Sequence, residues 1–481
     1  MYKLESKWSP QKKKAVKVSG KYIGVVTPGG VVPKRGTVPA VKTYHDYEFW
    51  ATYLLYRISG DLVEVLTRHF GEKSAVEIWI AAALRLATRC PFRAVRIKYE
   101  KSWISRQFPN IPLSRSNMTN ILRRIRNDRA ACAAFMRETM TPAPSMIVDG
   151  TRIISWSEGI TKAMPGHAHD HCHMPQADKI YVMSSDGGYG YPAFYRNVDG
   201  NTPDVSAMVL TMEDAGIRKA IVLGDAGFGS DGDYKELSDP RKELDHIIPL
   251  RRNTSEIKAG ESNDPYGDEY LKTVRYEDVF TYHGRAIDAH SETKDGYRVL
   301  VFRDAKMAAK EKSDFVMRKE KANATARTKK DFTIDKLVDI PRETAKVDWK
   351  FGIIPVRTSL LDFTPQRIYE TYKIRWQIEE LFNIMKNTCE QDTSHIQNNA
   401  GFEAWSFITH IMLMMACRVL ARIRDSGLEK DWSITVLMSA FTDVRIGLIG
   451  NNFVLNETTK KIRDVFSNLG VQLALPDHLS T

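Results

Sequence analysis

One segment in the C-terminal part of the chain, ETYKIRWQIEELFNIMKN, combines helical periodicity with reactive side chains on one face. Four of these side chains follow the spacing Y-x2-R-x3-E-x6-K: Tyr372, Arg375, Glu379 and Lys386. At roughly 100° per residue, that spacing places all four within an arc of about 60°. A carboxylate beside an arginine, a lysine and a phenol can hold a metal ion and bind phosphates. The segment predicts one long amphipathic helix with such a face. An ordinary solvated face carrying an i,i+4 ion pair is the alternative.

Two upstream aspartates lie in or just after strand-like apolar runs. Asp149 is the single acid within PSMIVDGTRIIS, and Asp225 follows the apolar run from Ala220 to Leu223 in RKAIVLGDAGFGS. A carboxylate at the end of a buried strand is rigidly held and still open to solvent, as a metal ligand must be. Taken alone, an aspartate in either setting is more commonly an ordinary turn or edge residue.

Around these residues the chain resembles the DDE transposases of insertion sequences that carry the Y-x2-R-x3-E-x6-K signature. The segment KIYVMSSDGGYGYPAFYRNVDGNTPD is similar to the second and third strands of that family and to its G-N-x-x-D turn, formed here by Gly200, Asn201 and Asp204. Asp204 is expected to cap the helix that follows. The resemblance covers residues 145–255 and 350–425, approximately.

The resemblance implies an α/β fold. Its RNase H-like catalytic core, a mixed sheet flanked by helices, is interrupted by a β-rich insertion. Three carboxylates are implied to be catalytic and to bind two Mg²⁺ ions, for which Mn²⁺ should substitute: Asp149, Asp225 and Glu379. Three further side chains are implied to contact the DNA backbone: Tyr372, Arg375 and Lys386. Arginine and lysine suit that role because both neutralise phosphates.

The implied activity is transposition of the protein's own mobile element. The enzyme would bind the terminal inverted repeats, cleave the ends by Mg²⁺-dependent phosphoryl transfer through a hairpin, and join them to target DNA. It would act as a homodimer on paired ends. Two other classes remain open. A nuclease or resolvase on the same fold would keep the three acids without needing specificity for its own ends. A catalytically silent regulator would bind DNA regardless of Mg²⁺ and of Glu379.

The interval between Asp225 and Glu379 is far longer than one helix, one strand and their loops require. It contains the β-prone runs LKTVRYEDVFTYHG and YRVLVFRD, followed by a basic run, Arg303 to Lys330, that suits a helix or a loop on DNA. This pattern favours an insertion over residues 256–350. In hairpin-forming relatives an insertion-domain tryptophan holds a flipped base. Trp349 is the implied DNA-binding counterpart, and simple packing is the alternative.

The charge of the chain is modestly basic, with 70 Lys and Arg against 59 Asp and Glu, a net charge of +11 and a pI near 9.2. That excess alone does not identify a DNA-binding protein. Its distribution is more informative, because residues 1–36 hold nine Lys or Arg and one acid, Glu5. Residues 1–40 are predicted to form a basic arm or small β element on DNA. A flexible soluble tail is the alternative.

Residues 41–145 are predicted to be a mostly helical DNA-binding domain. LSRSNMTNILRRIRND begins at a plausible N-cap, Ser114, and carries one apolar stripe: Met118, Ile121, Leu122 and Ile125. An upstream helix around Tyr99 to Gln107 would complete a helix-turn-helix-like pair. A plain helical bundle that supports the core is the alternative.

The remaining predictions concern the core, the C-terminus and metals. Residues 146–255 and 351–425 are assigned to the two parts of the RNase H-like core, and residues 426–481 to a C-terminal helical region with a possible dimer contact. FITHIMLMMACRVLA is expected to be a buried core helix rather than a membrane span. Five cysteines without a C-x-x-C pair, and no signal peptide, favour a cytoplasmic, nucleoid-associated protein.

GHAHDHCHMP places four histidines at alternating positions: His167, His169, His171 and His173. In an extended segment they would share a face and could bind a transition metal. A polar loop near DNA is the preferred interpretation.

Overall fold

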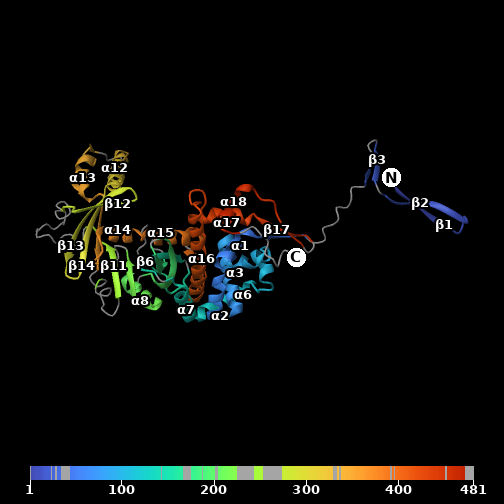
Figure 1. Ribbon diagram of the computed structural model, residues 1–481, viewed down its shortest axis with the longest axis horizontal. Coiled ribbons are helices and arrows are strands. Elements are labelled where there is room, and N and C mark those ends of the chain that lie inside the picture. Colours follow the sequence, from blue (N-terminus) through green and yellow to red (C-terminus); the bar gives the residue numbers. More distant parts are fainter. Residues whose placement is uncertain are drawn as a thin grey trace.

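The computed structural model is a mixed α/β structure in which a large sheet is flanked by helices (Figure 1). It describes residues 2–22, 24–27, 30–33, 44–141, 143–155, 157–165, 175–186, 188–200, 204–224, 234, 243–252, 274–328, 333–334, 337–390, 393–394, 396–449 and 452–471. The histidine-rich segment and Asp225 lie outside these residues.

The main sheet has the strand order β12-β13-β14-β15-β11-β10-β6-β8-β7, with β9 paired to β8 and β16 paired to β6. The core strands are β6 (Ser145–Ser155), β7 (Met164–Pro165), β8 (Pro175–Ser185), β9 (Gly190–Asp199), β10 (Lys219–Leu223), β11 (Glu243–Pro249), β15 (Ile353–Thr358) and β16 (Thr393–Ser394). β10 runs parallel to both β6 and β11, whereas β8 and β9 are antiparallel neighbours. β8 is buried along nearly its whole length, as expected for a strand covered on both faces.

The region assigned to the insertion extends the main sheet instead of forming a sheet of its own. β12 (Asp278–Tyr282), β13 (Arg285–Lys294) and β14 (Tyr297–Asp304) are antiparallel neighbours, and β14 joins them to β15, which pairs with β11. The basic run forms α12 (Ala305–Arg327), which begins where the Asp304 side chain accepts a hydrogen bond from the Met307 amide. α13 (Ile340–Val347) packs beside α12.

The N-terminal helices are α1 (Trp50–Ser59), α2 (Asp61–Phe70), α3 (Glu72–Thr88), α4 (Val95–Glu100), α5 (Ile104–Gln107), α6 (Arg115–Asn127) and α7 (Arg129–Thr139). The expected N-cap of α6 is confirmed, because the Ser114 side chain accepts from the Asn117 amide. Its apolar stripe is also confirmed: Met118, Ile121 and Ile125 are buried. The single helix expected upstream is instead divided into α4 and α5.

The C-terminal part of the chain packs against these helices. α16 (Asn399–Asp425) lies between the sheet and the N-terminal helices, in contact with β9, α3 and α6 (Figure 1). By length and composition α16 could cross a membrane, but most of its apolar window is buried inside the protein, as expected for a core helix. The four described cysteines are free and buried: Cys90, Cys132, Cys389 and Cys417.

Residues 426–481, expected to be helical, also contain a β-hairpin. α17 (Ile434–Thr442) and α18 (Lys460–Asn468) flank β17 (Arg445–Ile449) and β18 (Asn452–Leu455). β17 pairs with β5 (Tyr44–Glu48), which precedes α1. A strand that precedes the N-terminal helices and two strands from the C-terminal segment therefore form one three-stranded sheet.

The N-terminal arm forms two hairpins. β1 (Tyr2–Ser9) pairs with β2 (Lys14–Tyr22), and β3 (Gly24–Thr27) pairs with β4 (Gly30–Pro33). Neither hairpin pairs with any other strand in the described part of the chain.

The helix that follows β9 is α8 (Asp204–Ala215). It begins at Asp204, the residue that was expected to cap it, and its Met208 and Met212 are buried.

Candidate active site

Asp149 lies in β6, a strand with neighbours on both sides. It is opposite Tyr181 of β8, and the other edge of β6 pairs with β10 over residues that precede Asp149. One Asp149 carboxylate oxygen, Oδ1, accepts a 2.7 Å hydrogen bond from the amide of Gly150. The surrounding ladder fixes the backbone of this aspartate, so its carboxylate is held in place by the sheet.

The signature segment comprises three helical pieces, and the prediction of one uninterrupted α-helix is wrong. α14 (Pro365–Lys373) is followed by α15 (Trp376–Asn383) and by a π-helix, η5 (Ile384–Thr388). At the first junction the amides of Ile374 and Arg375 donate to carbonyls three residues back, which tightens the helix locally. The π-helix then widens it. Tyr372 and Lys386 consequently sit in pieces of different pitch, and the 60° arc expected for a regular helix does not apply.

Arg375 nevertheless brings Asp149 and Glu379 together. Its Nη1 lies 3.6 Å from Oδ2 of Asp149, and its Nη2 lies 2.6 Å from Oε1 of Glu379. The Arg375 and Asp149 side chains are 21% and 18% exposed, while Glu379 is 60% exposed. A single guanidinium thus holds two carboxylates from distant parts of the sequence, in charge-assisted contacts at the protein surface.

Two contacts of α15 that sequence reasoning missed hold the helix in place. Gln377 is buried, and its amide nitrogen donates to the Gly188 carbonyl at 3.0 Å, while the Ser185 hydroxyl donates to its amide oxygen at 2.9 Å. Glu380 accepts from Arg424 of α16 at 2.5 Å. Gln377 could have been noticed in the sequence, because it is a polar residue among the apolar positions of the predicted amphipathic helix.

The remaining predicted DNA contacts lie at other places. Tyr372 is half-buried near the end of α14, with the ammonium of Lys373 over its ring at 5.6 Å. Lys386 is half-buried in η5, and its side chain shows no contact with Asp149 or Glu379 among the described residues. Trp349 donates from its indole to the Lys346 carbonyl at 3.1 Å, and Lys350 lies over its ring.

The third predicted carboxylate, Asp225, lies outside the described residues. Within the part of the chain that is described, no group of three or more His, Cys, Asp and Glu side chains is arranged to hold a metal ion. The described strand that precedes Asp225 is β10, whose Leu223 pairs with Ile147 of β6 in a parallel register.

Residues 183–415, just under half of the chain, match the family model described as the transposase DDE domain. This match supports a DDE transposase. Its range includes Asp225, Arg375 and Glu379, whereas Asp149 precedes it. A comparison with curated proteins finds no match. Among solved structures, the cryo-EM structure of the piggyBac transposase synaptic complex with hairpin DNA aligns with a TM-score of 0.40 at 10% identity, covering 90% of this chain and 88% of that chain.

Proposed function

We propose that the protein is a transposase of its own mobile element. It binds the terminal inverted repeats, cleaves the DNA ends by Mg²⁺-dependent phosphoryl transfer, and joins the ends to target DNA. The observation that carries this proposal is the convergence of Asp149 and Glu379 on Arg375. The match to the transposase DDE domain supports it, because two of these three residues lie within the matched range.

The proposed metal ligands are Asp149, Asp225 and Glu379. The described pair fits hard divalent cations, because carboxylate oxygens are the ligands that Mg²⁺ prefers. The parallel register supports the third ligand. Leu223 pairs with Ile147, and each lies two residues before its aspartate in the sequence, Asp225 and Asp149 respectively. When bound, two such ions activate the attacking oxygen and stabilise the leaving oxygen.

The chain's own side chains would bind and orient the scissile phosphate. The guanidinium of Arg375 matches the non-bridging oxygens of a phosphate in a bidentate contact. Because this guanidinium now occupies both carboxylates, loading of cations there should release it towards the DNA. We also propose that Lys386, Tyr372 and Trp349 contact the DNA, away from the scissile phosphate.

The proposed enzyme has an RNase H-like core and works as a homodimer on paired ends, with a hairpin intermediate. Mn²⁺ should replace Mg²⁺, because both are cations that carboxylates bind. The main sheet supports the core assignment, since antiparallel β8 and β9 lie on one side of β6 and the parallel strand β10 on the other.

The test uses purified protein and a labelled duplex that carries the end of the element, with and without Mg²⁺. Wild type is compared with Glu379→Gln, which keeps the shape and removes the charge. Glu370→Gln is the matched control, because Glu370 is exposed on α14 and accepts a hydrogen bond from Gln366 of the same helix. We expect metal-dependent nicking at the element boundary in wild type and in the control, and none in Glu379→Gln.

Other results would point to other functions. Cleavage at arbitrary positions, with no preference for the element end, would indicate a nuclease. Tight DNA binding without cleavage by any variant, with several metals and with paired ends, would indicate a DNA-binding regulator.

A further inference from the structure

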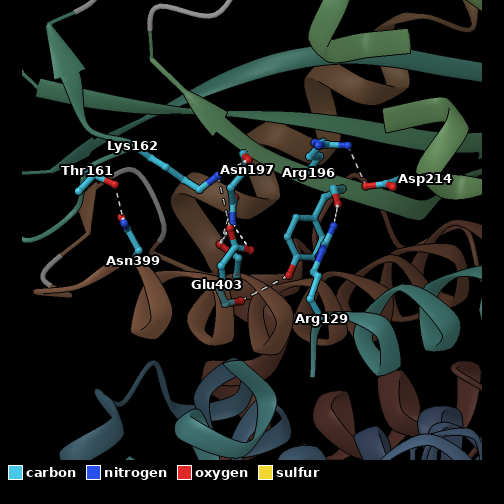
Figure 2. Close-up of polar contacts among 10 residues, drawn as sticks. Arg129, Thr161, Lys162, Arg196, Asn197, Asp214, Asn399 and Glu403 are labelled. Carbon is cyan, nitrogen blue, oxygen red and sulfur yellow. Dashed lines mark hydrogen bonds and ion pairs between the residues drawn. The ribbon is translucent and has the colours of Figure 1, made fainter. Parts of the chain in front are cut away.

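A cavity of about 280 Å³ is lined by residues of the edge strand β9 and of α6, α7, α8 and α16. Figure 2 shows several of these residues as sticks. Its charged lining consists of four cations and two carboxylates: Arg126, Arg129, Lys162, Arg196, Asp214 and Glu403. The candidate active site lies elsewhere, because Asp149 is two strands away. Tyr181 and Tyr195, which occupy the same row across the sheet, are buried against His410 of α16.

Both carboxylates of the cavity already have cationic or amide partners. Arg196 lies 2.9 Å from Asp214. Lys162 lies 3.9 Å from Glu403 and donates to the Asn197 carbonyl at 2.9 Å. The Asn197 amide completes the group by donating to Glu403 at 2.8 Å. Figure 2 shows these contacts as dashed lines between the labelled side chains.

The other two cations form no ion pair at contact distance with a carboxylate in the described part of the chain. Arg129 donates through Nη2 to the Tyr195 carbonyl at 3.0 Å, and its guanidinium lies over the Tyr195 ring. Its Nη1 is buried and has no hydrogen-bond partner among the described residues. Arg126, at the end of α6, is exposed and forms no ion pair with a described residue.

A buried cationic N–H group that lacks a hydrogen-bond acceptor favours an anion in the cavity. Buried polar groups are nearly always hydrogen-bonded, so the Nη1 of Arg129 calls for an acceptor. The cavity lining has two more positive than negative side chains, and this net positive charge attracts a negatively charged acceptor. A planar guanidinium with a free N–H edge matches the oxygens of a phosphate.

We propose that this cavity binds a phosphate group, held by Arg129 and Arg126, at a position separate from the candidate active site. The phosphate could come from duplex DNA or from a free phosphate ion, and both present the same oxygens. The proposal does not depend on DNA cleavage. It therefore stands or fails independently of the proposed function.

The test measures binding by the full-length protein in EDTA, so that metal-dependent chemistry is absent. The probes are inorganic phosphate, followed by calorimetry, and a random-sequence duplex, followed over a range of salt concentrations. The variants are Arg126→Ala and Arg129→Lys, which keeps the charge and removes the planar fork. Arg463→Ala is the control, because Arg463 is exposed on α18, outside both the cavity lining and the predicted DNA-binding domain.

We expect at least fivefold weaker binding of one probe by both cavity variants, and no change with Arg463→Ala. If DNA is the source, duplex affinity falls in both variants. For Arg126→Ala, the dependence of log affinity on log salt also becomes shallower by about one. If free phosphate is the source, only the phosphate titration changes. Unchanged binding of both probes by correctly folded variants would overturn the proposal, as would failure of the wild type to bind either one.

The same experiment separates this site from the active site. Arg375→Ala, which removes the proposed phosphate contact of the active site, should bind the phosphate probe as the wild type does, whatever its cleavage activity. Loss of phosphate binding in Arg375→Ala, with normal binding in Arg126→Ala, would assign the phosphate to the active site and overturn the proposal.

Discussion

Arg375 is the residue on which the candidate active site depends, because its guanidinium contacts both Asp149 and Glu379. Arg375→Ala should reduce cleavage at the element end by about 10²–10³-fold, the usual effect of removing one donor that stabilises transition-state charge. Binding of end DNA should fall only a few-fold, because other basic side chains are also proposed to contact the backbone. Rates from single-turnover cleavage and affinities from titration in Ca²⁺ separate the two effects.

A second measurement checks the same residue without any DNA. In EDTA, Arg375→Ala leaves Asp149 and Glu379 without the guanidinium, so the variant should melt below wild type, and added Mg²⁺ should narrow the difference. Arg367→Ala is the control on α14, because Arg367 stacks on Phe363 outside the site. Equal losses of cleavage and DNA binding in Arg375→Ala would contradict a local role at the scissile phosphate.

Glu48, which lies just before α1, makes the free energy of unfolding depend on pH. It is buried at the end of β5, and burial raises its pKa to about 7 despite hydrogen bonds from Thr52 and Ser102. A raised pKa in the folded state stabilises the fold fully below pH 4.5, and this contribution is lost as pH rises towards 7. The loss amounts to about 3 kcal/mol.

Glu48→Gln should therefore be more stable than wild type at pH 8 and about equal to it at pH 4.5, as measured by urea unfolding. Comparing the two proteins at each pH cancels the contributions of other titrating groups. Lys179 is one such group, because burial lowers its pKa to about 7. Glu100→Gln, a change at an exposed ion pair, should show no such pH-dependent gain. A gain for Glu48→Gln that is identical at both pH values would refute this assignment.

At the scale of one element, α15 is held in position by contacts on both of its sides. Gln377 binds the turn between β8 and β9, and Glu380 binds α16, so Arg375 and Glu379 are presented from a fixed helix. Gln377→Leu would leave the Gly188 carbonyl without its donor. We expect cleavage at saturating DNA to slow at least tenfold, with little change in the DNA concentration for half-maximal rate.

The control for this prediction is Gln366→Leu, because Gln366 is bonded to Glu370 at the exposed surface of α14. Gln377→Leu should remain folded, since the substitution leaves an apolar side chain at an otherwise buried position. Unchanged cleavage in a folded Gln377→Leu protein would show that these contacts do not position the site.

Local features could be predicted from the sequence, and long-range pairings could not. The cap at Ser114 and the stripe through Met118 depend on neighbouring residues, so the pattern alone indicated them. The breaks in the helix around Arg375 could not be predicted, because no proline or glycine lies near them in the sequence. We attribute these breaks to packing, because Gln377 and Glu380 must reach two different parts of the protein. The contact between Arg375 and Asp149 was not predicted, because the family resemblance implied only that both residues serve the same site.

At the scale of the whole molecule, the N-terminal helices and the C-terminal segment form one structural unit. β5, which precedes α1, pairs with β17, which follows α17, although the two strands are far apart in the sequence. Trp50 of α1 is fully buried and stacks on Phe466 of α18, with ring centroids 4.4 Å apart. A cut after residue 145, where sequence reasoning placed a domain boundary, would expose β5 and the faces of α3 and α6 that pack on α16.

A fragment of residues 44–141 should therefore fail to fold cooperatively on its own, whereas the full chain should lose both regions together. Phe466→Ala in the full chain should cost about 3–5 kcal/mol, the usual effect of deleting a buried phenylalanine. Because α1 and α18 share this contact, hydrogen exchange should quicken in both helices in that variant. Val436→Ala, a change at an exposed position of α17, should alter neither. A cooperative thermal transition of the isolated fragment, or faster exchange confined to α18, would mean that the N-terminal helices are an independent domain.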